Sequence, residues 1–319
     1  MTPTPSRPAP RAASGLPLAA FAALALLLAA PAHAQETDFA FLRIGTNAAA
    51  GAMGDAYVAH SRDAYATYWN PAGLAAATSN SLALSYHAWV AGVNTYGLAS
   101  RFRAGERGGV GLFVTAMGSG DLEARTRPGE ADGTFDLQYI SAGVAYGRSL
   151  GPVRAGVTAK YLTERIFEEK SSGYAFDLGL QADVLGGNLQ LGAALQHLGE
   201  MSELADEAPR LPRTLRVGAA VFPFRILTFD DHAALLSAML TADVVYLFPT
   251  EESQFHVGAA AQLFDVLTFR AGFMTNDALR RYTLGLGLAF EGLHFDYAFL
   301  PFENDFGDPG HLVTLTYAW

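Results

Sequence analysis

The sequence predicts an all-β protein: a transmembrane antiparallel β-barrel of about 14 strands with a short N-terminal, partly helical hatch inside the lumen. Three features indicate this fold. Apolar residues alternate with small or polar residues in many segments after residue 80, no later segment is apolar for long enough to form a membrane helix, and residues 35–80 are rich in small side chains. Because no linker divides the rest of the chain, we expect residues 81–319 to form one barrel domain.

The alternation is clearest near the C-terminus. Apolar residues occupy every second position in 284–290, 293–299 and 313–319. Because successive side chains of a strand point to opposite faces, each segment has one apolar face. No amphipathic helix follows to cover that face, and aromatic residues cluster near the strand ends, as they do where a barrel meets lipid. We expect the last strand, with Tyr317 and Trp319, to carry the signal that the outer-membrane insertion machinery recognises.

Residues 1–34 have the features of a secretory signal peptide. Arg7 and Arg11 precede an apolar run over 18–30, and Ala-His-Ala follows at 32–34, so cleavage is expected before Gln35. The apolar run is too short to span a bilayer, which requires about 20 residues. We therefore expect export, and a location in the outer membrane of a Gram-negative-type bacterium with outer-membrane lipid as a partner.

Fourteen segments can be interpreted as strands. An even number fits single-chain bacterial barrels, which place both termini in the periplasm and have short periplasmic turns and longer outer loops. The predicted strands are 81–90, 93–103, 110–118, 134–148, 152–163, 173–184, 188–197, 213–223, 236–247, 254–263, 266–274, 281–290, 292–300 and 310–319. The predicted outer loops include 119–133, 164–172, 198–212, 275–280 and 301–309. Two connections depart from the rule, because 91–92 is short for an outer loop and 224–235 is long for a periplasmic turn.

Charged residues fall on the strand positions opposite to the apolar ones. A cation in the hydrocarbon at the bilayer midplane costs about 2–4 kcal/mol, so these residues are expected to face the lumen. There they would form ion pairs and bind water, which we favour over a solute-specific role. The lumen-facing charged residues are Arg154, Lys160, Asp177, Asp183, Arg216, Asp243, Arg270, His294 and Asp296.

Composition and motifs exclude several classes of function. The chain has 319 residues, no cysteine and a net charge of −10 without basic clusters, so nucleic acid is not an expected partner. His294 and Asp296 lie two residues apart on one strand, but no Gly-x-Ser-x-Gly elbow or metal-ligand spacing accompanies them. We therefore expect no enzymatic activity, no metal and no cofactor.

Residues 35–80 do not alternate like a spanning strand. Met53 and Tyr57 lie among glycines and alanines, which suits a short helix or a tight coil packed closely inside another structure. After Trp69, the Asn70-Pro71-Ala72-Gly73 sequence predicts a turn that opens a short helix, because Pro71 biases Asn70 away from helical geometry. The lumen of a barrel of this size is larger than its own side chains fill, so this segment is expected to plug it.

Several of these motifs resemble the PorV/PorQ family of outer-membrane proteins. They are FLRIG at 41–45, GAMGDAYVA at 51–59, YWNPAGLA at 68–75, LPRTLRVG at 211–218, FRAGF at 269–273 and FDYA at 295–298, with Gly310-His311 before the last strand. Asp55 departs from the family pattern, which commonly has Gly there. The Asn-Pro-Ala turn is also similar to the hatch of the wider FadL superfamily, which implies a fourteen-stranded barrel with an internal plug.

The resemblance implies two alternative functions. PorV/PorQ-like proteins act with the type IX secretion system, which implies type IX components and cargo C-terminal domains as partners; the acidic loops 119–133, 198–212 and 301–309 would then contact the cargo. FadL-like proteins pass hydrophobic or small solutes, which implies a lumen pathway past the hatch. In that case Phe41, Met53, Tyr57 and Trp69 would gate the pathway, unless they only pack the hatch against the wall.

Overall fold

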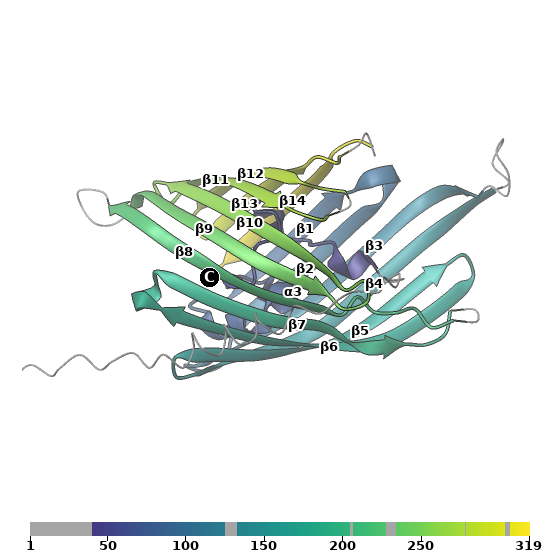
Figure 1. The fold of residues 1–319 in the computed structure, drawn as a ribbon, viewed down its shortest axis with the longest axis horizontal. Helices are drawn as coiled ribbons and strands as arrows, with labels where there is room; N and C mark the ends of the chain where they lie inside the picture. The colour runs from purple at the N-terminus through teal and green to yellow at the C-terminus, as the bar shows by residue number, and fades with distance from the viewer. Residues whose placement is uncertain (1–39, 125–132, 205–206, 228–233, 278, 304–306) are drawn as a thin grey trace, which may run out of the picture.

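The protein is a closed antiparallel barrel of fourteen strands that surrounds an N-terminal hatch (Figure 1). This computed structural model describes residues 40–124, 133–204, 207–227, 234–277, 279–303 and 307–319. Each strand pairs with its neighbours in the sequence, and β14 closes the barrel against β1. The predicted fold class is therefore confirmed. No helix in the described ranges is long and apolar enough to cross a membrane.

Every predicted strand is present within a few residues of its predicted bounds, apart from longer extensions at one end of the barrel. The strands are β1 Ser81–Ala88, β2 Asn94–Arg103, β3 Gly108–Ala124, β4 Gly133–Leu150, β5 Val153–Ile166, β6 Glu169–Val184, β7 Leu189–Met201, β8 Thr214–Leu227, β9 Ala234–Leu247, β10 Glu252–Leu263, β11 Leu267–Met274, β12 Tyr282–Phe290, β13 Leu293–Leu300 and β14 Gly310–Ala318.

The outer face of the barrel is apolar. Leu284, Leu286 and Leu288 on β12 are 45 to 56% exposed. Leu286 pairs with Phe269 on β11 and Tyr297 on β13, so the apolar face continues from strand to strand. No described element covers these side chains. An uncovered apolar surface around a closed barrel is what the hydrocarbon of a bilayer requires.

The two ends of the barrel differ. At the end that we call the turn end, Asn80 and Trp319 exchange two backbone hydrogen bonds of 3.0 Å, and short connections such as 151–152 and 291–292 join the strands. At the opposite end, the loop end, the longer connections 202–213, 275–281 and 301–309 occur. The long connection predicted at 224–235 is shorter than expected, because β8 and β9 extend to Leu227 and from Ala234.

Two predicted outer loops were wrong in their extent. In place of 164–172, β5 and β6 form a hairpin that stays paired to Ile166 and Glu169, and β3 and β4 stay paired to Ala124 and Gly133. The pairing continues because hydrogen bonds between strands satisfy the backbone whether or not the side chains are apolar. Of the acidic residues predicted in the outer loops, Glu130, Asp132, Asp206 and Asp305 lie outside the described residues.

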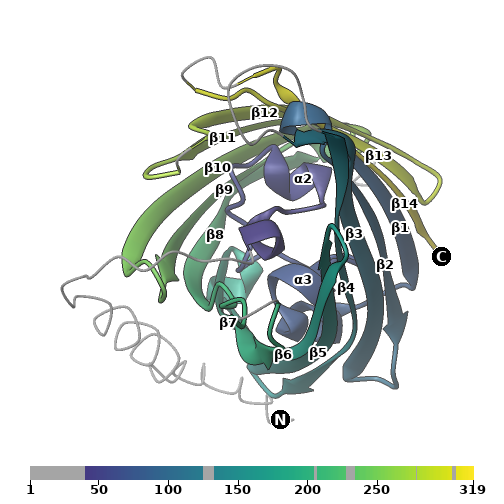
Figure 2. The ribbon, with the colours of Figure 1, turned by 90° about the vertical axis from the view of Figure 1, so that its right-hand side faces the viewer.

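The hatch lies inside the ring of strands (Figure 2). It contacts the wall near the loop end through Phe41 and near the turn end through Arg62. It consists of η1 Ala40–Arg43, α2 Ala48–Gly51, α3 Ala66–Trp69 and η2 Pro71–Ala76. Asn70 begins η2: its side-chain oxygen accepts from the Ala72 N–H, and its side-chain nitrogen donates to the carbonyls of Val58, Leu180 and Ala193. One amide thus joins two parts of the hatch to β6 and β7.

Inward-facing glycines let the hatch backbone approach the wall. A Cβ atom added to Gly156 on β5 would lie 2.3 Å from the carbonyl carbon of Pro71, and one added to Gly192 on β7 would lie 2.4 Å from the Val58 oxygen. Such contacts are too short for any side chain larger than hydrogen. The hatch is therefore seated in a wall whose residues are small where it touches.

Candidate functional site

Cavities lie on both sides of the hatch. On the turn-end side, an inner cavity of about 240 Å³ lies beside Met53 and Tyr57, and it shares His60 and Phe222 with a mouth cavity of about 620 Å³. On the loop-end side is a separate cavity of about 180 Å³, which we call the vestibule. The vestibule is lined by Arg43, Ile44, Asp55, Trp89, Arg216, Val245, Gln254, His256, Asp277, Leu279 and Arg280.

Residues 53–57 of the hatch, the barrier segment, separate these spaces. Met53 and Tyr57 line the inner cavity, whereas Asp55 lines the vestibule. The backbone of the segment is hydrogen-bonded both to the end of α2, where Asp55 N–H donates to the Ala50 carbonyl at 3.0 Å, and to wall side chains. Gly54 N–H donates to Thr283 Oγ1 at 3.0 Å, and Tyr57 N–H donates to an Asp243 carboxylate oxygen at 2.9 Å.

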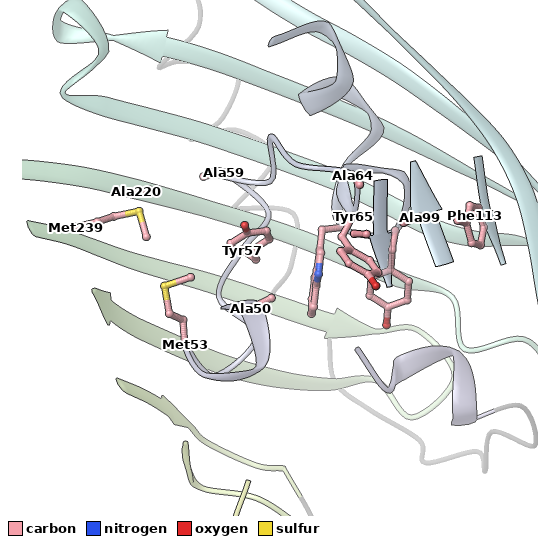
Figure 3. Packing of buried hydrophobic residues seen from close by; sticks show 13 residues of the cluster. Ala50, Met53, Tyr57, Ala59, Ala64, Tyr65, Ala99, Phe113, Ala220 and Met239 are labelled. Carbon is pink, nitrogen blue, oxygen red and sulfur yellow. The ribbon is translucent and has the colours of Figure 1, made fainter. Parts of the chain in front are cut away.

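Two methionines lie at the turn-end face of the barrier. Figure 3 shows Met53 from the hatch and Met239 from β9 extending toward each other beside Tyr57. Methionine side chains are unbranched and adapt easily to a changing shape. Both methionines line the inner cavity.

The vestibule holds the ion pairs between the hatch and the loop end. Arg280 donates to Asp55 at 2.8 Å and lies 3.5 Å from Asp277 Oδ2, with its guanidinium 5.5 Å from the centre of the Trp89 ring. Burial opposes the charged form of Asp277, but Arg280 and two backbone N–H groups outweigh it and lower its pKa. The pKa of Arg280 is raised by the two carboxylates despite its burial.

A second set of polar contacts holds the hatch at the turn end. Arg62 forms an ion pair with Asp183, which also accepts from Arg154 at 2.8 and 3.0 Å. The Gln190 amide lies between His60 and Arg62; with its nitrogen toward His60 Nδ1 at 2.8 Å, its oxygen accepts from Arg62 at 3.1 Å. Burial lowers the pKa of His60 and of Arg62.

The structure places the predicted charged residues on the lumen side and joins most of them in polar contacts. Lys160 pairs with Asp177 at 2.6 Å and lies 3.1 Å from His197, at a bulge in β7. Arg270 pairs with Asp296 at 2.6 Å. Asp243 binds the hatch, as described above, and Arg216 donates to Gln196. His294 is different, because it lies exposed near the turn end.

The predicted hatch residues divide into two groups. Trp69 and Asn70 to Gly73 are buried and line none of the three cavities described above. Phe41 stacks on Tyr139 with ring centroids 4.7 Å apart, so it packs the hatch against the wall. Of the four residues predicted to gate the pathway, only Met53 and Tyr57 line one of these three cavities.

Six charged residues at these cavities were missed as site residues: Arg43, Asp55, Arg62, Asp265, Asp277 and Arg280. Asp55 carried a usable signal, since it departs from the Gly of the pattern that the sequence resembles, and its φ of 59° lies in the left-handed region that favours Gly. An aspartate kept at such a position indicates a role for its carboxylate.

The predicted insertion signal lies at the turn end. Tyr317 and Trp319 are about half exposed and stack with centroids 5.6 Å apart, and Phe102 meets the Trp319 ring at 6.3 Å. These aromatics form part of the outer face at the edge of the barrel, where aromatic residues meet the membrane interface.

Within the described residues, no group of three or more His, Cys, Asp or Glu side chains could hold a metal ion.

Comparisons with known proteins support the fold. No family model matches the sequence, and no curated protein matches it. The crystal structure of the P. putida toluene transporter TodX matches with a TM-score of 0.56 and 14% identity, covering 86% of this chain and 98% of that chain. A Pseudomonas aeruginosa FadL homologue matches with a TM-score of 0.51 and 13% identity over the same shares. The fold is thus similar to that of these two proteins.

Proposed function

We propose that this protein is an outer-membrane channel that passes a small solute through its lumen when the barrier segment shifts. The turn end would face the periplasm and the loop end the exterior, as the short-turn rule for such barrels requires. The FadL-like fold and the toluene transporter among its structural neighbours support a transport role over an enzymatic one.

The observation that carries the proposal is the position of the barrier segment between two cavities. If the hatch only stabilised the barrel, no cavity would be needed on either side of the barrier segment. Here residues 53–57 are the part of the hatch that borders both the vestibule and the inner cavity. The inner cavity continues into the mouth cavity through shared lining residues, so displacing this segment would connect the two ends of the barrel.

Deleting residues 36–78 tests whether the hatch closes the lumen. The remaining barrel should still insert and become heat-modifiable, and its ion conductance in planar bilayers should exceed that of the full chain. An inserted barrel of unchanged conductance would mean that another segment closes the pore or that the lumen is already open.

A second candidate is a type IX secretion component that binds cargo at the cell surface, as the PorV/PorQ resemblance implies. One observation favours it: at the loop end, residues 199–201, 208–211, 213 and 248–249 line a cavity of about 450 Å³. Exposed Arg210 and Arg213 lie beside apolar Phe248 there, a combination common in protein interfaces.

Replacing residues 202–210 by a short Gly-Ser turn separates the two candidates. The replacement spares Met201 and Leu211, which are buried against the wall. A cargo-binding protein should lose pull-down of cargo C-terminal domains, whereas a lumen channel should keep its conductance. Retained cargo binding would remove this surface from consideration, and a source genome without type IX machinery would remove the candidate.

A further inference from the structure

The vestibule carries more positive than negative charge. Three guanidinium groups line it, those of Arg43, Arg216 and Arg280, against the two carboxylates of Asp55 and Asp277, which leaves a net charge of +1 (3 minus 2). Both carboxylates contact Arg280. Arg43 and Arg216 therefore share the cavity without a carboxylate partner among the described residues.

Buried polar atoms in the vestibule lack hydrogen-bond partners. Arg216 is 6% exposed; its Nε donates to Gln196 at 3.1 Å and its guanidinium lies 5.0 Å from the centre of the Trp69 ring, but its Nη1 has no partner. His256 is 2% exposed, and its Nδ1 is also without a partner. Asp55 Oδ1, which also belongs to this lining, has no partner either. Because buried donors and acceptors are normally satisfied, three such residues on one cavity indicate a bound ligand.

Arg43 approaches the same cavity from the hatch. Its guanidinium forms no hydrogen bond or ion pair with the residues that the structure describes. Burial lowers the pKa of Arg43, Asp277 partly offsets that effect, and Arg216 adds to it, so the charged side chain is held where its charge is poorly compensated. An anion between Arg43 on η1 and Arg216 on β8 would compensate both groups at once.

Apart from Gln254, the rest of the lining is apolar. Ile44, Trp89, Val245 and Leu279 face the same space of about 180 Å³, which is too small for a long alkyl chain. We propose that the vestibule binds a small organic monocarboxylate, with its carboxylate held by Arg43 and Arg216 and its apolar part against Trp89 and Leu279. The net charge of the lining matches a monoanion. This proposal names the class of solute for the channel proposed above. It rests on the channel function only for the biological role of the site, not for the binding itself.

Equilibrium binding of benzoate to the full chain in detergent micelles at pH 7.5 tests the assignment, with benzamide as the uncharged ligand of similar shape. The unmodified protein should bind benzoate at least tenfold more tightly than benzamide, because hydrogen bonds to charged groups contribute about 1.5–3 kcal/mol. Arg43→Gln and Arg216→Gln should each weaken benzoate binding about tenfold and leave benzamide binding unchanged. Arg107→Gln, at an exposed turn-end residue, is the matched control and should change neither.

Arg216 packs on Trp69, so its variant is first checked for heat-modifiability; if it fails to fold, Arg43→Gln decides the test. Absence of benzoate binding, equal affinity for benzoate and benzamide, or unchanged benzoate affinity in Arg43→Gln would overturn the proposal. The outcome is independent of passage through the barrel. Charge-selective binding in a barrel that never conducts would contradict the channel and leave this site standing.

Discussion

Asp55 of the hatch and Arg280 of the β11–β12 connection, 225 residues apart in the sequence, form a buried ion pair of 2.8 Å. Asp55 has a φ of 59°, so the backbone of the barrier segment turns through a left-handed residue where the carboxylate meets the guanidinium. The loop end of the barrel is thereby attached to the segment that separates the two cavities.

Removing the Asp55 carboxylate should loosen this attachment. Asp55→Ala should lower the free energy of unfolding in detergent micelles by about 3–5 kcal/mol, because Arg280 would lose its closest partner in a buried site. Asp55→Gly removes the same carboxylate but suits the left-handed backbone, so it should cost less than Asp55→Ala. Equal stability of Asp55→Ala and the unmodified protein would show that the pair contributes nothing to seating the hatch.

The seating of η2 against the wall predicts a strong effect of one added methyl group. Gly156→Ala would place a Cβ atom 2.3 Å from the Pro71 carbonyl carbon, so the hatch or β5 must move. We expect a loss of at least about 1–3 kcal/mol, the usual cost of overpacking. Gly120→Ala on β3 is the matched control, since nothing lies within 4 Å of its added Cβ. Equal unfolding midpoints for the two variants would contradict the close contact.

The hatch should be less stable in acid because of His60. Its folded-state pKa lies below the ordinary value of 6.5, so the unfolded chain binds the proton more readily. The stability contributed by neutral His60 is therefore fully present above about pH 6.5 and decreases as the pH falls below it. The denaturation midpoint should be lower at pH 5.5 than at pH 7.5, and His60→Gln should reduce that difference. If the denaturation midpoint of His60→Gln differs between pH 5.5 and pH 7.5 as much as that of the unmodified protein, other groups cause the pH dependence.

The terminal aromatic pair should matter for insertion. Deleting Trp319 removes its stacking on Tyr317 and its two backbone hydrogen bonds to Asn80, so the inserted, heat-modifiable fraction should fall. Trp319→Phe keeps an aromatic ring and should retain most insertion. Normal amounts of membrane-inserted protein after the deletion would show that this residue is dispensable for recognition.

The barrel could be predicted from the sequence because its signal is local. Alternation such as that of Leu284, Leu286 and Leu288 is required wherever one strand face meets lipid, so each strand could be recognised by itself. The alternation is lost where a strand extends beyond the membrane, because no face of the strand there contacts hydrocarbon. The sequence therefore predicts a loop at the place where β5 and β6 stay paired to Ile166 and Glu169.

The cavities could not be predicted, because they depend on contacts between distant segments. Asn70 and Pro71 indicated a turn, and the turn exists. Nothing near them in the sequence shows that the turn packs against Gly156 and Gly179 of the wall. The charged lumen residues were expected to pair, yet the sequence does not show which ones remain without a carboxylate. Arg216 was among them, and its lack of a partner is visible only once the hatch is in place.

The central claim is that passage through the barrel requires the barrier segment to move, together with the end of α2 that adjoins it. Locking it in place tests this claim directly. The chain has no cysteine, and a Cβ atom at Gly51 on α2 would lie 3.9 Å from the Ala298 Cβ on β13, a separation suited to a disulfide. Gly51→Cys with Ala298→Cys therefore tethers the hatch to the wall reversibly.

The measurement is the frequency of opening events in planar bilayers for the double cysteine variant, oxidised and then reduced, with Gly51→Cys alone as the control. Opening should cease in the oxidised double variant, return after reduction, and be insensitive to oxidation in the single variant. Openings that persist at the same frequency with the disulfide formed would contradict the claim that the hatch must move.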